Sequence, residues 1–117
     1  MMTAIRMVAI TLVTGLSWPV ALVAQTAAPV VRIDAPKEGA TLEAKAKNEL
    51  VYEYQPAPPG DHVHAYVDGK QIAILRERKG RYPLTSLAPG AREICVKMVN
   101  KAHAPIGADQ CVRVSVR

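Results

Sequence analysis

Two runs of alternating apolar residues near the carboxyl end place the strongest constraint on the fold of this chain. Residues 94–99 and 111–116 each alternate apolar with other side chains, and each run holds one cysteine, Cys95 or Cys111. Alternation with a period of two is typical of strands that bury one face. The segment therefore predicts a β-hairpin, with residues 100–108 as its loop.

The positions of the two cysteines predict a disulfide. They lie symmetrically about residue 103, so a hairpin centred there places Cys95 directly opposite Cys111 on one face of the sheet. Cross-strand β-carbons at such positions are about 4.5–5.5 Å apart, and a bridge needs only slight puckering to close that distance. Closing a loop of this length stabilises a chain by roughly 3 kcal/mol in the chain-entropy model.

The first 24 residues predict a secretory signal peptide. Residues 1–6 include a positive charge, residues 7–23 are mostly apolar, and small residues follow. This order is typical of an exported chain. A spanning helix needs ~20 predominantly apolar residues, and glycine, serine and proline interrupt this run. We therefore expect cleavage after Ala24 and no stable membrane anchor.

Export agrees with the expected disulfide, because such bridges persist in oxidising compartments. We expect a periplasmic or secreted protein in which residues 25–30 form a leader and residues 31–117 form one small domain. A domain of this size buries a modest share of its surface, so a covalent bridge is a useful addition to its stability.

The rest of the chain consists of short β-rich runs separated by turn residues. Asp68 and Gly69 lie between two such runs and are a strong hairpin signal. Residues 42–47 are expected to form a loop or an irregular edge strand, and the charged residues 76–81 a solvated turn. About seven short strands without a helical period predict an all-β, immunoglobulin-like β-sandwich. The expected strands lie within residues 31–35, 50–54, 62–67, 71–76, 81–87, 94–99 and 111–116.

Alternation also assigns the two faces of the strands. The side chains expected in the core are Val63, Ala65, Val67, Ile94, Val96, Met98, Val112, Val114 and Val116. The side chains expected on the outer face are His62, His64, Tyr66, Cys95, Lys97, Val99, Cys111, Arg113 and Ser115.

Charge and aromatic content argue against a nucleic-acid partner. Without Arg6, which lies in the predicted signal, the chain has 14 Lys and Arg against 10 Asp and Glu, a net charge of +4. Basic and acidic residues are intermixed, phenylalanine is absent, and the single tryptophan, Trp18, lies in the signal. Nucleic-acid binders typically combine a basic stripe with aromatic platforms.

Two segments carry a family resemblance. Residues 84–90, read Leu-Thr-Ser-Leu-Ala-Pro-Gly, resemble the turn before the sixth strand of fibronectin type III and related immunoglobulin-like domains. Residues 60–69 are similar to the histidine-containing strand of small exported bacterial domains of unknown function. Those domains carry His-x-His, Asp-Gly, Leu-x-Pro-Gly and a later histidine. The resemblance implies an immunoglobulin-like sandwich in the periplasm and brings no known activity.

All three histidines belong to the predicted domain: His62, His64 and His103. His62 and His64 share one face of a strand, and in an immunoglobulin-like order the loop with His103 emerges at the same end. Three neutral imidazoles suit copper or zinc, with Asp61, Asp109 and Met98 as possible fourth ligands, although Met98 is expected to point inward. The alternative is that the histidines sit on the surface or order a loop, and that both aspartates cap turns.

The sequence offers little for catalysis. It lacks a nucleophile elbow, a glycine-rich phosphate loop and a Cys-x-x-Cys pair, and cleavage after Ala24 leaves Gln25, not histidine, as the first residue. We therefore expect a non-enzymatic module that binds an envelope protein or glycan, for which an exposed sheet edge offers strand addition. A small metal-binding protein that uses copper or zinc is the alternative.

Overall fold

The computed structural model describes residues 9–20 and 27–117. Residues 9–20 contain neither helix nor strand, and the rest of the predicted signal peptide and part of the leader lie outside the described residues. Within the described ranges, no helix is long and apolar enough to cross a membrane. The first strand begins at Val30, one residue before the predicted start of the domain.

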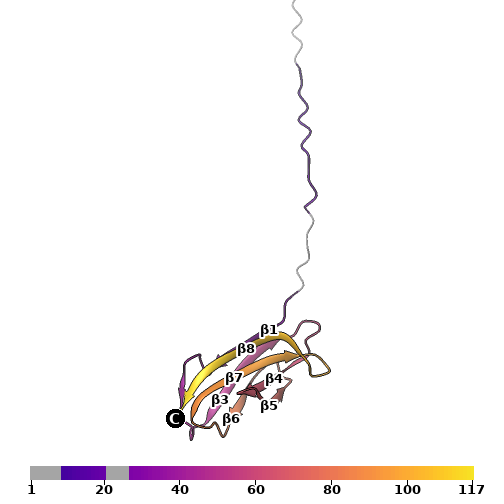
Figure 1. Ribbon diagram of the computed structural model, residues 1–117. Coiled ribbons are helices and arrows are strands. Elements are labelled where there is room, and N and C mark those ends of the chain that lie inside the picture. The colour runs from indigo at the N-terminus through magenta and orange to yellow at the C-terminus, as the bar shows by residue number, and fades with distance from the viewer. Residues whose placement is uncertain (1–8, 21–26) are drawn as a thin grey trace, which may run out of the picture.

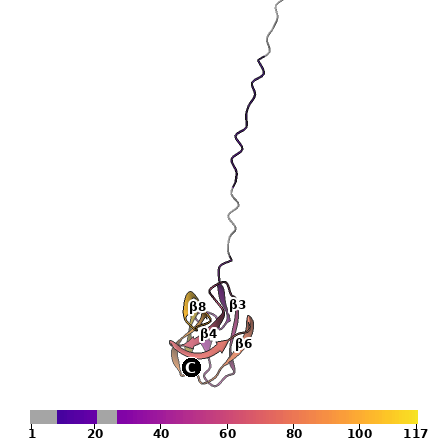
Figure 2. The same ribbon diagram turned by 90° about the vertical axis from the view of Figure 1, so that its right-hand side faces the viewer.

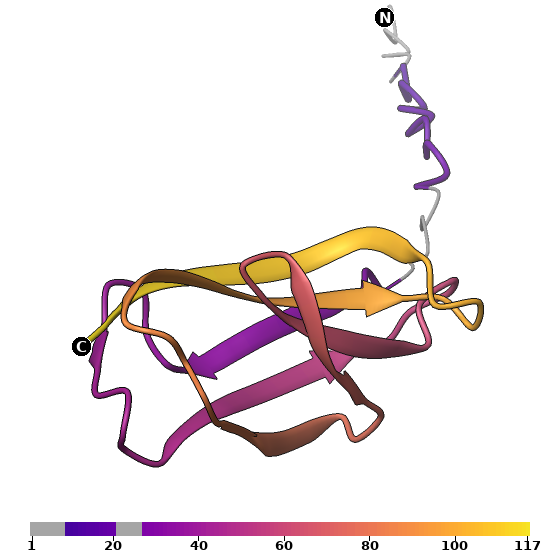
Figure 3. The same ribbon diagram turned by 60° about the horizontal axis from the view of Figure 1, so that its bottom comes forward.

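The described chain forms two antiparallel layers of strands packed face to face (Figures 1 and 3). One sheet has the order β1-β3-β6, and the other has the order β2-β8-β7-β4-β5. Seen from the side, β8 and β4 of the larger sheet lie against β3 and β6 of the smaller one (Figure 2). The strands are β1 (Val30–Ala35), β2 (Thr41–Leu42), β3 (Asn48–Gln55), β4 (His62–Val67), β5 (Lys70–Leu75), β6 (Lys79–Leu84), β7 (Gly90–Val99) and β8 (Pro105–Val116).

The predicted all-β sandwich is confirmed, with one strand more than expected. The additional strand is the two-residue β2, which pairs in parallel with the end of β8 and lies beside the stretch predicted as a loop or irregular edge strand. The hairpin predicted at Asp68 and Gly69 is present, and both residues have positive φ, of 49° and 80°. Positive φ at both central residues matches the right-handed twist of the flanking strands.

The core lies between the sheets and contains the side chains that alternation assigned to it. Those of β7 and β8 are buried, as are Val63 and Ala65 of β4, while Val67 at the strand end is half-buried. The smaller sheet contributes Ile33, Leu50, Tyr52 and Leu84 from the opposite side. Burial of apolar surface stabilises the fold by about 25 cal/mol per Å². A strand that turned these side chains to the solvent would lose this stabilisation, so burial fixes which face points inward.

The predicted disulfide is confirmed. Cys95 of β7 pairs directly with Cys111 of β8 in the ladder, and their sulfurs are bonded, with the two Cα atoms 4.0 Å apart. Cys95 is buried, whereas Cys111 is exposed on the outer face. The bridge therefore fixes the register of β7 against β8 just below the loop that joins them.

Two predictions about loops were wrong. The β7–β8 loop covers residues 100–104, not 100–108, because β8 already begins at Pro105. The register shifts near Val99, and Gly107, with a φ of 90°, lets the strand start irregularly, as a glycine does in a bulge. The charged run 76–81 is only in part a turn, since β6 begins at Lys79.

Side chains and bulges block parts of the sheet edges. On the β5 edge, the Tyr82 hydroxyl from the other sheet donates to the Ile72 carbonyl at 3.2 Å, and the pairing of β5 with β4 contains a register shift. On the β1 edge, the Ile33 amide donates to the Gln110 side-chain oxygen at 2.8 Å. On the β6 edge, Pro83 has no N–H to offer. These are features that limit strand addition.

Removal of the disulfide should lower the free energy of unfolding. For the double variant Cys95→Ala/Cys111→Ser we expect a loss of about 2–3 kcal/mol, because the unfolded chain is no longer closed into a loop. Urea denaturation followed by circular dichroism measures this loss. Wild-type protein in excess dithiol serves as the control and should show the same loss, and a midpoint and slope unchanged by the substitutions would contradict the prediction.

Candidate metal centre

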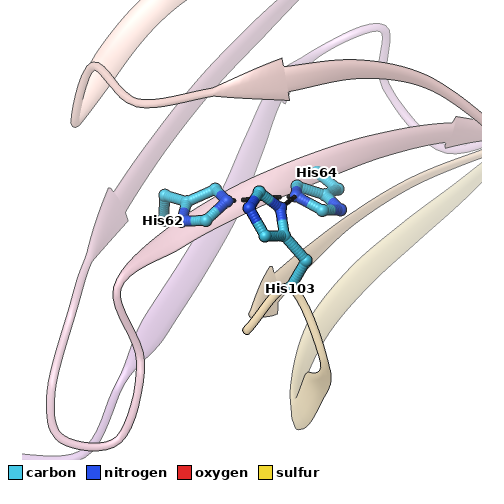
Figure 4. A group of neighbouring side chains, drawn as sticks. All are labelled: His62, His64 and His103. Carbon is cyan, nitrogen blue, oxygen red and sulfur yellow. Dashed lines mark hydrogen bonds between the residues drawn. The ribbon is translucent and has the colours of Figure 1, made fainter. Parts of the chain in front are cut away.

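Strand β4 and the β7–β8 loop bring the three histidines together at one end of the larger sheet. His62 and His64 are two residues apart on β4, so their rings project from the same face. His103 reaches them from the loop, and the three rings face one another (Figure 4). The Nε2 atoms of His62 and His64 are 3.0 Å apart, and Nδ1 of His103 is 3.0 Å from Nε2 of His64.

The side chain of Asn100 organises the loop that carries His103. Its Oδ1 atom accepts hydrogen bonds from the amides of Ala102, at 2.9 Å, and Ala104, at 3.0 Å. The backbone of Asn100 makes two more hydrogen bonds in the loop. Its backbone carbonyl accepts from the His103 N–H at 2.9 Å, and its backbone N–H donates to the Ala104 carbonyl at 2.9 Å. His103 has a φ of 64°, in the left-handed region. Four hydrogen bonds to Asn100 thus hold the backbone conformation that aims the His103 ring at His64.

The outer-face position of the β4 histidines is confirmed, but the expectation that this face is exposed was wrong. Only 2% of His62 and 2% of His64 is exposed, while His103 is exposed. The His103 ring packs against both, with centroid separations of 4.8 Å and 5.1 Å. The adjacent Val99 of β7 is also fully buried. Alternation identifies the face of a strand, but not the loop that folds over it.

Asp61 fixes the orientation of the His62 ring. Its Oδ2 atom lies 2.9 Å from Nδ1 of His62, and because a carboxylate only accepts, the ring must donate from Nδ1. This hydrogen bond lowers the pKa of Asp61 below its ordinary value. Arg76 Nη1 lies 3.8 Å from the same carboxylate oxygen. In its neutral form, His62 therefore presents the lone pair of Nε2 to the other two rings.

When the three rings are neutral, the facing nitrogens cannot make a hydrogen bond at both of their close contacts. With Nε2 of His62 unprotonated, a proton on Nε2 of His64 satisfies one 3.0 Å contact and leaves the other without its own proton. If Nδ1 of His103 instead donates to Nε2 of His64, then Nε2 of His64 carries no proton, and the lone pairs of the His62 and His64 Nε2 atoms oppose each other. A cation at this point would remove the conflict by accepting one lone pair from each neutral ring.

His64 is the least accommodated of the three rings in the protein alone. Its Nδ1 atom is buried and has no hydrogen-bond partner among the described residues. Burial lowers the pKa of His64 below its ordinary value of 6.5, and repulsion from the neighbouring His62 and His103 in their charged forms lowers it further, whereas the side chain of Gln71 raises it. The neutral form of the ring, which is the form that binds metals, is therefore favoured.

The distances fit a single metal ion. Zinc binds histidine nitrogen at about 2.0–2.1 Å, so two nitrogens on one ion are about 2.9 Å apart at a right angle and about 3.4 Å apart in a tetrahedron. The two contacts of 3.0 Å fall within this range, and all three ligand atoms lie within 4.8 Å of one another.

The proposed fourth ligands do not join this group. Met98 is fully buried in the core, and a Cβ atom added to Gly60 would lie only 2.3 Å from its sulfur. Asp109 is exposed on β8 and is not part of the cluster, and Asp61 lies behind the His62 ring. The two cysteines lie near Glu93 in a second cluster, but their sulfurs are bonded to each other and provide no thiolate.

Sequence reasoning missed two residues of the site. Asn100 carries a turn signal, because asparagine side chains bond to the backbone two residues on, and this signal was available. Arg76, beside Asp61, lies at the end of β5, and nothing in its local sequence distinguishes it from the charged residues that follow. Its position depends on the pairing of β4 with β5.

Comparison with known proteins supports the fold. No protein-family model matches the chain, and no curated protein matches it. Among solved structures, it is similar to the fibronectin(III)-like modules of Clostridium thermocellum CbhA, with a TM-score of 0.63 and 21% identity over 75% of this chain and 97% of that chain. The fold is that of a fibronectin type III-like module. An engineered protein is also similar, with a TM-score of 0.54 and 17% identity over 80% of this chain and 21% of that chain.

The likeness confirms the fibronectin type III part of the predicted resemblance. At these identities it establishes the fold alone. Because a fold does not determine a function, the function of this module has to be argued from its own site.

Acid should destabilise the metal-free module. The pKa of His64 is lower in the folded than in the unfolded state, so the unfolded state binds more protons as the pH falls through about 6.5. The stabilisation is complete above that value and is lost below it. We expect the free energy of unfolding, measured with urea in a chelator, to fall from pH 7.5 to pH 5.

The variant His64→Gln is the control for this pH dependence. Without the His64 ring, the slope between pH 7.5 and pH 5 should be smaller than in the wild type, whatever the stability of the variant at neutral pH. A wild-type stability that stays constant or rises on acidification would show that His64 is not held in its neutral form.

Proposed function

We propose that this protein is a small exported metal-binding module that holds one copper or zinc ion through His62, His64 and His103. The observation that carries the proposal is the convergence of three imidazole nitrogens, two pairs of them 3.0 Å apart, from segments distant in the sequence. Two further observations support it. Neutral rings leave one of these two contacts without a hydrogen bond, and the hydrogen bond to Asp61 makes Nδ1 of His62 the donor, which leaves Nε2 for the ion. The function is binding, without catalysis by the chain.

Copper(II) is the ion that the ligand set favours. Three neutral imidazoles suit both copper and zinc, and for a given set of nitrogen ligands copper(II) binds more tightly than zinc. The three histidines are also largely held in place before an ion binds. Two ligands are fixed on a hydrogen-bonded strand and the third on a loop whose backbone is already ordered, so little conformational freedom is lost when the ion binds.

Export belongs to the same proposal. The disulfide between Cys95 and Cys111 supports a periplasmic or secreted location, since such bridges are typical of oxidising compartments. The amino-terminal pattern of charge, apolar run and small residues supports it independently.

A binding module for an envelope protein or glycan is the second candidate function. A hollow of about 460 Å³ favours it; the hollow lies between the edge strands β5 and β6 and is lined by Ile72, Tyr82 and Leu84 among others. Strand addition is the weaker route, because Tyr82 and Pro83 block parts of these same edges. Binding to envelope extract that survives chelation and loss of the histidines would favour this function over metal binding.

Isothermal titration calorimetry of residues 25–117 with copper(II) and zinc tests the metal proposal. We expect one site per chain at neutral pH, with copper bound more tightly than zinc. The double variant His62→Ala/His64→Ala should lose the site, because it removes two of three ligands, and His103→Ala should weaken binding at least about tenfold.

The exposed position of His103 makes His103→Ala less disruptive to the core than the double variant, and circular dichroism in chelator checks that the variant is folded. The chain has three histidines, so no other imidazole can replace a lost ligand. The proposal fails if wild-type protein has no site tighter than the high-micromolar range, or if the double variant binds as tightly as the wild type.

Asp61 should tune the affinity without binding the ion. Hydrogen-bond partners of metal-binding histidines typically contribute 10–100-fold to metal affinity. We therefore expect Asp61→Asn to weaken copper binding by about tenfold, as measured by competition with a chelator. Asp109→Asn removes the same charge from an exposed residue outside the cluster and should leave the affinity within about twofold of the wild type.

A further inference from the structure

We propose that the metal ion held by the three histidines keeps one coordination position open, and that this position binds a small monoanion. This inference rests on the proposed metal site and adds the class of ligand that the loaded site takes. Three features of the structure carry it: the number of ligands, the charges around them, and the access from solvent.

The described side chains bring three ligand atoms together at this point. Among the described histidines, cysteines and acidic residues, only His62, His64 and His103 bring ligand atoms together at this point. Asp61 contacts the opposite side of the His62 ring, through Nδ1. Structural zinc sites are closed by four protein ligands, whereas three protein ligands leave a position for water or an exogenous group.

The charges near the site favour an anion in that position. The three ligands are neutral imidazoles, so they do not offset the charge of a divalent ion. The one carboxylate nearby, Asp61, is shared between His62 and Arg76. Arg76 also places positive charge near His64, and Lys101 places positive charge near Asp61. An incoming monoanion therefore meets a net positive centre.

The site is reachable from solvent. His103 is exposed, so a small ion reaches the cluster from the side of the β7–β8 loop. Lys101, which is exposed on the same loop, adds positive charge on this side. The sheet and its core close the other side, behind the buried rings of His62 and His64.

Azide titration of the copper-loaded protein tests the inference. Protein carrying one equivalent of copper(II) is titrated with sodium azide, and the azide-to-copper charge-transfer absorption is recorded, with copper retention checked by gel filtration. We expect a single saturable transition. Chloride should compete with azide, because both are monoanions of small size.

Arg76→Gln provides the electrostatic test, with Arg78→Gln as its matched control. Loss of the Arg76 charge should weaken azide binding by about two- to fivefold, the effect of one charge several ångströms away in partly aqueous surroundings. Arg78→Gln removes the same charge from an exposed position two residues along the chain and should leave azide affinity unchanged.

Each outcome separates this inference from the metal proposal. Copper that stays bound without any azide-dependent absorption would mean that the ion has no open position, and the metal site alone would stand. Copper stripped from the protein by azide would also overturn the inference, as would equal azide affinities in the Arg76 and Arg78 variants. Failure of copper to bind in the first titration would remove both proposals together.

Discussion

Hydrogen bonding along both sides of β7 is the constraint on which the rest of the molecule depends. β7 pairs with β8 on one side and with β4 on the other, so β8, which follows β7 directly, and β4, which lies much earlier in the sequence, acquire a common register. The β7–β8 pairing places the cysteines opposite each other and delivers the loop with His103 to one end of the sheet. The β4–β7 pairing places His62 beside Val99 and His64 beside Lys97 at that same end.

The histidine cluster is a place where the protein alone leaves its hydrogen bonding incomplete. Most buried polar groups in proteins are paired, yet Nδ1 of His64 has no partner within hydrogen-bonding geometry among the described residues, and neutral rings leave one of the two contacts between the facing nitrogens without a hydrogen bond. Such a local deficit is typical of sites that complete themselves with a ligand. The disulfide, the core and the ion pairs of the outer faces show no comparable deficit, which separates this end of the sheet from the rest of the surface.

Alternation alone predicted the parts of the structure that depend on strand faces. It placed Met98 in the core, Cys95 opposite Cys111, and His62 beside His64 on one side of a strand. It did not predict features that depend on contacts between elements distant in the sequence. The start of β8 was read as loop, because Pro105 and Gly107 are residue types that strands usually avoid, and the burial of His62 and His64 depends on a loop that folds over the sheet. The role of Arg76 was invisible because only the pairing of β4 with β5 brings it to Asp61.

The four hydrogen bonds that Asn100 makes within its own loop also bear on how quickly the proposed site would capture an ion. If the third histidine lay on a flexible loop, its ring would have to reorient after the first two nitrogens had bound the ion. The ion could dissociate before that reorientation was complete. Here the loop has settled its shape during folding. The rate of ion binding should then be set by diffusion and by loss of water from the ion. The lifetime of the bound state should be set by the rate at which the hydrogen bonds of this short loop open.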